Sequence, residues 1–296
     1  MSAVFEPPFE VLAPFEQTLP FVFNTPHSGR HYPASFLAES RLDQHALRRS
    51  EDCFVDLLFA EAPNRGAPLL KAHFPRAYLD ANREPYELDP RMFEGRLPSF
   101  ANTRSVRVAG GLGSIPRIVG DGQEIYRGRL QVAEAFRRID SLYRPYHRAL
   151  RSLMQQTQRQ FAEAILFDCH SMPSVSLGPD NGQRPDIVLG DRYGTSCAAH
   201  LIDITQQAFE NCGYSVARNR PYAGGFITEH YGHPVSGNHA IQIELNRALY
   251  MDEETLQPTA GFPALKHDLT AIIEAIAAAL SASIRAIPGH YRQAAE

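Results

Sequence analysis

The chain has 296 residues, of which 44% are hydrophobic and 21% charged, a balance typical of globular proteins that argues against intrinsic disorder. With 29 Lys and Arg against 33 Asp and Glu residues, the net charge of −4 gives no sign of a nucleic acid partner. No uncharged apolar run of about 18 residues occurs and the N-terminus lacks the positive start of a signal peptide, so neither a membrane span nor secretion is expected.

In the first half of the chain, residues 1–19 are expected to be an irregular lead-in. Apolar spacing predicts an amphipathic helix over 42–62. Residues 84–129 are rich in Pro, Gly and Arg and predict a long loop region near the site, of the kind that often carries binding residues. The strands predicted in this half are 21–25, 67–74 and 77–81.

In the second half, a helical stretch over 130–161 is expected to be kinked or divided at Pro145. A further helix should begin at Thr195, its N-cap, and end before Gly213, and a final helix should span 263–287. The strands predicted here are 164–169, 186–191, 214–219 and 240–245. Strands alternating with helices predict a single α/β domain over residues 1–296, with a mixed, largely parallel sheet flanked by helices.

Two histidines follow buried strands of this sheet. His27 lies in "TPHSG" after the first strand, and His170 in "FDCHSMPS" at the end of another. Ligands bind such sheets beyond the carboxyl ends of their strands, so both imidazoles are expected at one edge. Neutral imidazole is the commonest metal ligand, and a catalytic zinc site usually has three protein ligands. A structural, hydrogen-bonded role for each histidine is the alternative.

The third ligand should be a carboxylate or another histidine. The helix predicted after the first strand offers Glu51, Asp52 and Asp56, and Asp52 with Asp56 would share one helical face. The alternative is that Asp52 forms a solvated pair with Arg48 on the same helix.

Other polar side chains suggest contacts to a substrate. Arg83, beside Asn82 in "LDANREP", is placed to present a planar fork to a carboxylate, and Arg76 precedes the same strand. A surface salt bridge is the alternative for each arginine. Glu244 lies in the apolar run "AIQIEL", where it is either a general base with a raised pKa or a buried partner of an arginine. The histidines that cluster before this strand are His230, His233 and His239.

Eight segments together resemble the N-formylglutamate amidohydrolases, or formylglutamate deformylases, of histidine degradation. They run in order from about Pro20 to Asp252. They are "TPHSG", "EDCFVD", "YLDANREP", "GLGSIPR", "RPYHRAL", "FDCHSMPS", "DIVLGDRYGTSC" and "GGFITEHYGHPVSGNHAIQIELNRALYM". The resemblance implies a zinc-carboxypeptidase-like α/β fold and metal-dependent hydrolysis of N-formyl-L-glutamate to L-glutamate and formate.

The resemblance also assigns roles to residues. The metal ligands that it implies are His27, Asp52 and His170. Asp56 completes the acidic motif, and Glu51 remains an alternative to Asp52, because zinc carboxypeptidases have a glutamate where this chain has Arg30. Glu244 matches the catalytic glutamate of those peptidases. The residues expected to bind substrate are Asn82, Arg83, Arg117 or Arg220, and His239.

In the reaction so implied, Glu244 moves the water proton and Arg76 holds the oxyanion. The substrate is a small anionic acyl amino acid. Zn²⁺ is expected from the ligand types, although Fe²⁺, Co²⁺, Mn²⁺ and Ni²⁺ also suit such a site. Four cysteines without a CxxC pair indicate the cytoplasm, and the sequence specifies no oligomeric state.

Three other functions compete with this one. The first is hydrolysis of another N-acyl amino acid or peptide amide at the same metal site. The second is a thiol hydrolase using Cys169 and His170, which is disfavoured because adjacent residues on a strand point to opposite faces. The third is a binding protein of the same fold without turnover.

Overall fold

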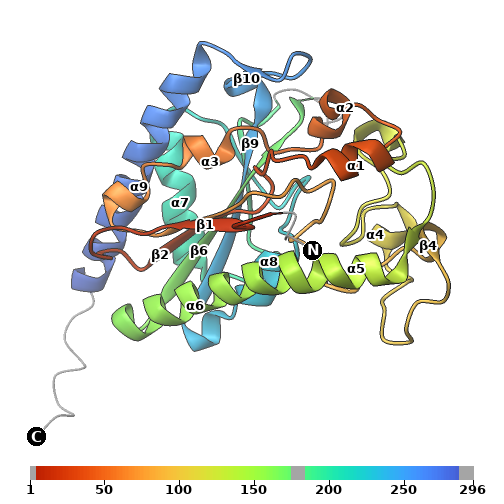
Figure 1. The fold of residues 1–296 in the computed structure, drawn as a ribbon. Coiled ribbons are helices and arrows are strands. Elements are labelled where there is room, and N and C mark those ends of the chain that lie inside the picture. Colours follow the sequence, from red (N-terminus) through yellow and green to blue (C-terminus); the bar gives the residue numbers. More distant parts are fainter. Residues whose placement is uncertain (1–4, 175–183, 287–296) are drawn as a thin grey trace, which may run out of the picture.

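The computed structural model describes residues 5–174 and 184–286, with a seven-stranded mixed sheet at its centre (Figure 1). The strand order is β1-β3-β2-β6-β9-β7-β8. The strands are β1 (Phe9–Leu12), β2 (Phe21–Thr25), β3 (Leu69–Ala72), β6 (Ala164–Met172), β7 (Ile187–Gly190), β8 (Val216–Arg218) and β9 (Asn238–Asn246). Strands β3, β2, β6 and β9 are mutually parallel, whereas β1 pairs antiparallel with β3, and β7 antiparallel with β9. The predicted mixed, largely parallel sheet is confirmed.

Helices cover both faces of the sheet, α7 and α9 one face and α6 and α8 the other (Figure 1). These helices are α6 (Arg144–Phe161), α7 (Ala199–Asn211), α8 (Phe226–Tyr231) and α9 (Gly261–Ala286). Alternation along β6 divides its residues between two cores: Phe167 packs towards α7 and α9, and Leu166 towards α6. Full burial of one such side chain contributes about 1.5–3 kcal/mol, so these two cores hold the sheet in place.

The other elements are short. The helices are α1 (Ala34–Glu39), α2 (Gln44–Arg48), α3 (Val55–Leu58), α4 (Val106–Ala109) and α5 (Val132–Arg138). The 3₁₀ and π turns are η1 (Pro63–Arg65), η2 (Pro90–Met92), η3 (Gly120–Gly122), η4 (Ile139–Tyr143), η6 (Pro234–Ser236) and η7 (Arg247–Leu249). The remaining strands are β4 (Phe93–Glu94), β5 (Leu130–Gln131), β10 (Met251–Asp252) and β11 (Gln257–Pro258). None of the helices within the described ranges has the length and apolar character needed to cross a membrane.

Several predicted elements are confirmed. Strand β2 has the predicted bounds, and the long region 84–129 contains only short elements. The helical stretch 130–161 runs through α5, the π turn η4 and α6, and the π turn lies just before Pro145, where a proline removes an internal N–H donor. The single-domain interpretation and the likeness to zinc carboxypeptidases stay predictions.

Four predictions about local structure are wrong. The lead-in contains β1, because its backbone pairs with the exposed edge of β3. Residues 77–81 form turns, held by Pro75 and Ser114 carbonyl groups instead of a strand partner. Thr195 is not an N-cap: helix α7 begins at Ala199, after Ala198. The helix over 42–62 is interrupted between α2 and α3, where Phe54 has a left-handed φ of 64°.

Candidate metal centre

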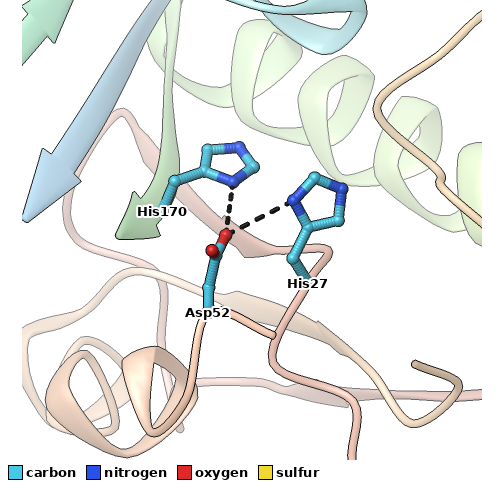
Figure 2. A group of neighbouring side chains, drawn as sticks. All are labelled: His27, Asp52 and His170. Atoms are coloured by element: carbon cyan, nitrogen blue, oxygen red, sulfur yellow. Dashed lines mark hydrogen bonds and ion pairs between the residues drawn. The ribbon is translucent and has the colours of Figure 1, made fainter. Parts of the chain in front are cut away.

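Three buried side chains meet beyond the carboxyl ends of β2 and β6 (Figure 2). His27 lies in the turn after β2, His170 near the end of β6, and Asp52 in the break between α2 and α3. Asp52 Oδ2 is 2.8 Å from His170 Nδ1 and 3.3 Å from His27 Nδ1. One nitrogen or oxygen from each residue lies within 4.8 Å of the others, a spacing that a single metal ion can bridge. The two predicted histidines and Asp52 are therefore brought together.

The backbone around His27 explains how distant segments reach this point. Gly29 passes so close to β3 that a Cβ there would lie 2.1 Å from the Phe74 carbonyl oxygen, so no larger residue fits. The Asp52 N–H donates to the His27 carbonyl at 3.1 Å, and Ser28 Oγ donates to the Asp52 carbonyl at 3.0 Å. The bond from the Asp52 N–H replaces the one that a continuous helix would direct to the Arg48 carbonyl, and the predicted helix is interrupted at this point.

A second layer of carboxylates orients both imidazole rings. His27 Nε2 lies 2.7 Å from Asp80 Oδ1, and His170 Nε2 lies 3.0 Å from Asp168 Oδ2. Each ring therefore directs its Nδ1 towards the centre, the arrangement in which metal-bound histidines are usually held. Within the described residues, His27 Nδ1 is buried without a hydrogen-bond partner. A buried nitrogen in this state needs a ligand, so the donor set fits a metal ion.

The charged groups around the centre determine the protonation of Asp52 and His170, and therefore the pH dependence of metal binding. Burial alone would raise the pKa of Asp52, but the hydrogen bond from His170 and the nearby charge of both histidines hold it well below its usual range. Burial alone would lower the pKa of His170, but Asp168 and Asp52 raise it well above its ordinary value. His170 must lose its proton before it can bind a metal. Metal binding should therefore weaken as the pH falls.

Glu244 lies beside this centre. It is on β9, directly across from His170 in the register of β6, and its side chain is buried. Burial raises its pKa to about 7. Its hydrogen-bond partner is Gln242, whose Nε2 donates to Glu244 Oε1 at 2.8 Å while its Oε1 accepts from the Gly225 N–H at 2.7 Å. The pair with an arginine, the alternative considered for Glu244, is not formed among the described residues.

Two arginines approach from the Asp80 side. Arg76 Nη2 is 2.9 Å from Asp80 Oδ2, and Arg83 Nη2 is 3.6 Å from the same oxygen. Burial alone would lower the pKa of Arg76, but the charges of Asp80, Asp52 and Glu244 raise it. Burial lowers the pKa of Arg83, and repulsion from Arg76 adds to the effect. Two cations thus share one carboxylate.

Asn82 is occupied within the protein. Its Nδ2 lies 3.3 Å from Asp168 Oδ2 and 3.2 Å from His170 Nε2, and its Oδ1 accepts from the Ile227 N–H at 2.8 Å. In this structure its hydrogen-bonding groups join His170 to the start of α8, and the expectation that this amide donates to a substrate stays a prediction. Arg83 also uses two groups internally, on the Leu112 and Asn82 carbonyls.

Other predicted residues lie outside the cluster. Arg117 is paired with Asp89 at 3.0 Å and Glu124 at 3.1 Å. His239 is a correction: it lies at the opposite end of β9 from Glu244, beside Ile165 and the Ala198 N–H, because a strand of this length separates its two ends widely. The side chain of Arg220 is exposed.

The acidic motif also contributes fewer side chains than expected. Asp56, which was expected to complete the acidic motif, pairs with Arg30 at 3.0 Å and lies outside the cluster of His27, Asp52 and His170. Glu51 accepts from Tyr32 at 2.7 Å and pairs with Arg48, so neither the alternative ligand nor the Asp52–Arg48 pair is formed. Cys169 lies in the core between the sheet and α7 and α9, away from His170, and burial raises its pKa well above the usual range.

Three side chains that contact the cluster were not singled out from the sequence: Asp80, Asp168 and Arg247, whose Nη2 lies 3.4 Å from Asp52 Oδ1. A signal for Asp168 was present, because it is two residues before His170 on one strand and so faces the same way. Like Glu244, it is also a charge within an apolar run, which needs a partner. Asp80 and Arg247 lie outside the sheet strands, Arg247 at the start of η7, and no apolar run or regular spacing marks either residue.

Known proteins with a similar sequence or structure decide the family. Residues 19–251 match the family model described as N-formylglutamate amidohydrolase. The chain belongs to this family. It is 32% identical to the N-formylglutamate deformylase of Pseudomonas aeruginosa over 83% of this chain and 87% of that protein. It is 28% identical to the N-formylglutamate deformylase of Pseudomonas putida over 82% of this chain and 86% of that protein.

Solved structures agree with this family. The crystal structure of N-formylglutamate amidohydrolase from Ralstonia eutropha JMP134 has a TM-score of 0.88 at 36% identity, covering 94% of this chain and 99% of that one. A protein from Agrobacterium tumefaciens has a TM-score of 0.64 at 19% identity, covering 93% and 94%, which extends the likeness in fold alone. The family resemblance drawn from the eight sequence segments is confirmed.

Proposed function

We propose that this protein hydrolyses the formamide bond of N-formyl-L-glutamate to L-glutamate and formate, with one divalent metal ion, Zn²⁺, held by His27, Asp52 and His170. Family membership supports the reaction, since the relatives from both Pseudomonas species are named as deformylases of this compound. The observation that carries the proposal is the grouping of three metal donors, a buried glutamate and two arginines that share one carboxylate.

Glu244 is the proton carrier in this proposal. When bound, the metal would lower the pKa of a water molecule towards about 7 and polarise the formyl oxygen. Glu244 has a pKa of about 7, so it can accept the proton of that water and deliver it to the leaving amine at neutral pH. Its bond from Gln242 Nε2 to Oε1 fixes the carboxylate and leaves Oε2 for this proton.

The arginines provide for a negative substrate. Arg76 contacts Asp80 through Nη2, and its other N–H groups can stabilise the oxygen that gains charge during attack. Arg83 Nη2 is 3.6 Å from Asp80 Oδ2, a long contact that a substrate carboxylate could replace, while its Nε and Nη1 are bound to carbonyl groups that hold the side chain in place. Since Asp80 neutralises one guanidinium, the second attracts an acidic acyl amino acid such as N-formylglutamate.

The biological setting is part of the same proposal. Hydrolysis of formylglutamate would place the protein in histidine degradation, as the resemblance implies. All four cysteines are free, and Cys53, Cys169 and Cys197 are buried, which supports the reducing cytoplasm as its compartment.

A substrate panel tests the assignment. Formate and acetate release are measured from N-formyl-L-glutamate, N-formyl-L-methionine and N-acetyl-L-glutamate. The proposal predicts the highest kcat/KM for formylglutamate, because it combines the small acyl group with two carboxylates. A kcat/KM for formylmethionine above that for formylglutamate would contradict the role of the arginines. A kcat/KM for acetylglutamate above that for formylglutamate would assign the protein to another N-acyl amino acid. Bound metal without hydrolysis of any compound would favour a binding relative without turnover.

A further inference from the structure

We propose that Arg247 is a positioning residue that makes Asp52 a metal ligand through one oxygen only. Arg247 begins the turn η7 directly after β9, and its side chain is buried. The inference rests on the metal site proposed above, but it does not depend on which amide the protein hydrolyses.

The contacts of Arg247 all fall on the segment that carries Asp52 or on its neighbour in space. Nη2 donates to the Glu51 carbonyl at 2.6 Å and to Asp52 Oδ1 at 3.4 Å. Nη1 donates to the Arg49 carbonyl at 3.2 Å, and Nε donates to Ser171 Oγ at 3.1 Å. One guanidinium thus fixes the backbone on the N-terminal side of Asp52 and touches the carboxylate itself.

The two oxygens of Asp52 consequently have different surroundings. Oδ2 faces the Nδ1 atoms of His27 and His170, whereas Oδ1 faces Arg247 and, at 3.5 Å, Ser171 Oγ. A carboxylate with one oxygen held by a fixed cation presents the other oxygen in a single direction. The segment needs such support, because it lies outside the helices: α2 ends at Arg48, and Phe54, just before α3, has a left-handed backbone conformation.

The sign of the effect separates this role from simple electrostatics. A permanent positive charge near a metal ion repels it, so charge alone predicts that removal of Arg247 tightens metal binding. The positioning role predicts the opposite, because Asp52 would lose its fixed direction. Loss of an outer partner of a metal ligand typically lowers metal affinity by about 10- to 100-fold.

The test is the dissociation constant for Zn²⁺, measured on the full chain by competition with a chelating dye. We expect Arg247→Met to bind Zn²⁺ about 10- to 100-fold more weakly than the wild type. Arg247→Lys keeps the positive charge but not the planar guanidinium, so its dissociation constant for Zn²⁺ should lie between those of the wild type and Arg247→Met. The visible absorption bands of the Co²⁺-loaded protein should also change in Arg247→Met, since the carboxylate is then free to bind through both oxygens.

Arg48→Met is the matched control. It removes a guanidinium from the same segment, but one bonded to the Glu51 side chain and not to Asp52. Its Zn²⁺ affinity and Co²⁺ spectrum should stay near the wild-type values even if its melting temperature falls. Equal losses in both variants would overturn the proposal by showing a general loosening of the segment.

Unchanged or tighter Zn²⁺ binding by Arg247→Met would also overturn it. If Arg247→Met does not fold, Arg247→Lys and Ser171→Ala provide the test. Each variant should remain folded and bind Zn²⁺ more weakly than the wild type. Wild-type Zn²⁺ affinity in both variants would contradict the inference. Failure of the wild type to bind any divalent metal would instead refute the metal site itself, so the two failures are distinguishable.

Discussion

Replacing Glu244 by Gln should remove a pH-dependent loss of stability from the metal-free protein. The glutamate has an ordinary pKa of 4.5 and burial raises it to about 7 in the folded chain. The folded state therefore holds this proton more tightly than the unfolded state does. Its stabilising contribution is fully present below about pH 4.5 and is lost as the pH rises through 7.

The size of the effect follows from the two pKa values. Each pH unit between them is worth about 1.4 kcal/mol, so full ionisation of Glu244 costs the folded state roughly 3 kcal/mol. A glutamine is neutral throughout and its amide oxygen can still accept the hydrogen bond from Gln242 Nε2. From this difference alone, Glu244→Gln should exceed the wild type in free energy of unfolding by about 1 kcal/mol at pH 5 and about 3 kcal/mol at pH 8.

The assay is urea unfolding of both proteins in the presence of a chelator, at several pH values from 5 to 8. Other titrating groups are common to both proteins and cancel in the difference. Glu229→Gln, which changes an exposed glutamate paired with Arg192, is the control and should show no such trend. A difference between Glu244→Gln and wild type that does not change with pH would refute the reasoning, because Glu244 would then not be a proton carrier with a raised pKa.

Three further predictions concern metal and substrate. Glu244→Gln should keep one metal per chain and lose about 10²- to 10⁴-fold in kcat, and near-normal turnover would remove Glu244 from the proton transfer. His170→Ala should abolish metal binding measured by elemental analysis, whereas Glu51→Gln should retain it; the reverse result would mean that the ligand set is wrong. Arg83→Ala should raise KM for formylglutamate far more than for a neutral formyl amide, and equal effects on both would indicate a structural role.

The strands and the principal donors could be predicted from the sequence because each has a local pattern. Strands β6 and β9 are apolar runs, and a histidine or glutamate within such a run stands out from its neighbours. That pattern was sufficient to select His27, His170 and Glu244. The family resemblance then favoured Asp52 over Glu51, and the structure places Asp52 beside both histidines.

The remaining features depend on contacts between distant segments. At the break between α2 and α3, the Asp52 N–H bonds to the His27 carbonyl, and Arg247, almost two hundred residues away, donates to the Arg49 and Glu51 carbonyl groups. Asn82 was predicted from the sequence only as a substrate-binding residue, whereas in the structure it also joins Asp168 and His170 to the start of α8. The residues next to an asparagine in the sequence do not show whether its side-chain amide faces a cleft or joins two elements of the fold.

The measurement that tests the central claim most directly is formate release from N-formyl-L-glutamate by one protein sample in three states. The sample is assayed as purified, after removal of metal with a chelator, and after return of about one equivalent of Zn²⁺. The account predicts that activity is lost on chelation and restored by Zn²⁺. Full activity in the chelated sample, with metal shown to be absent, would contradict it.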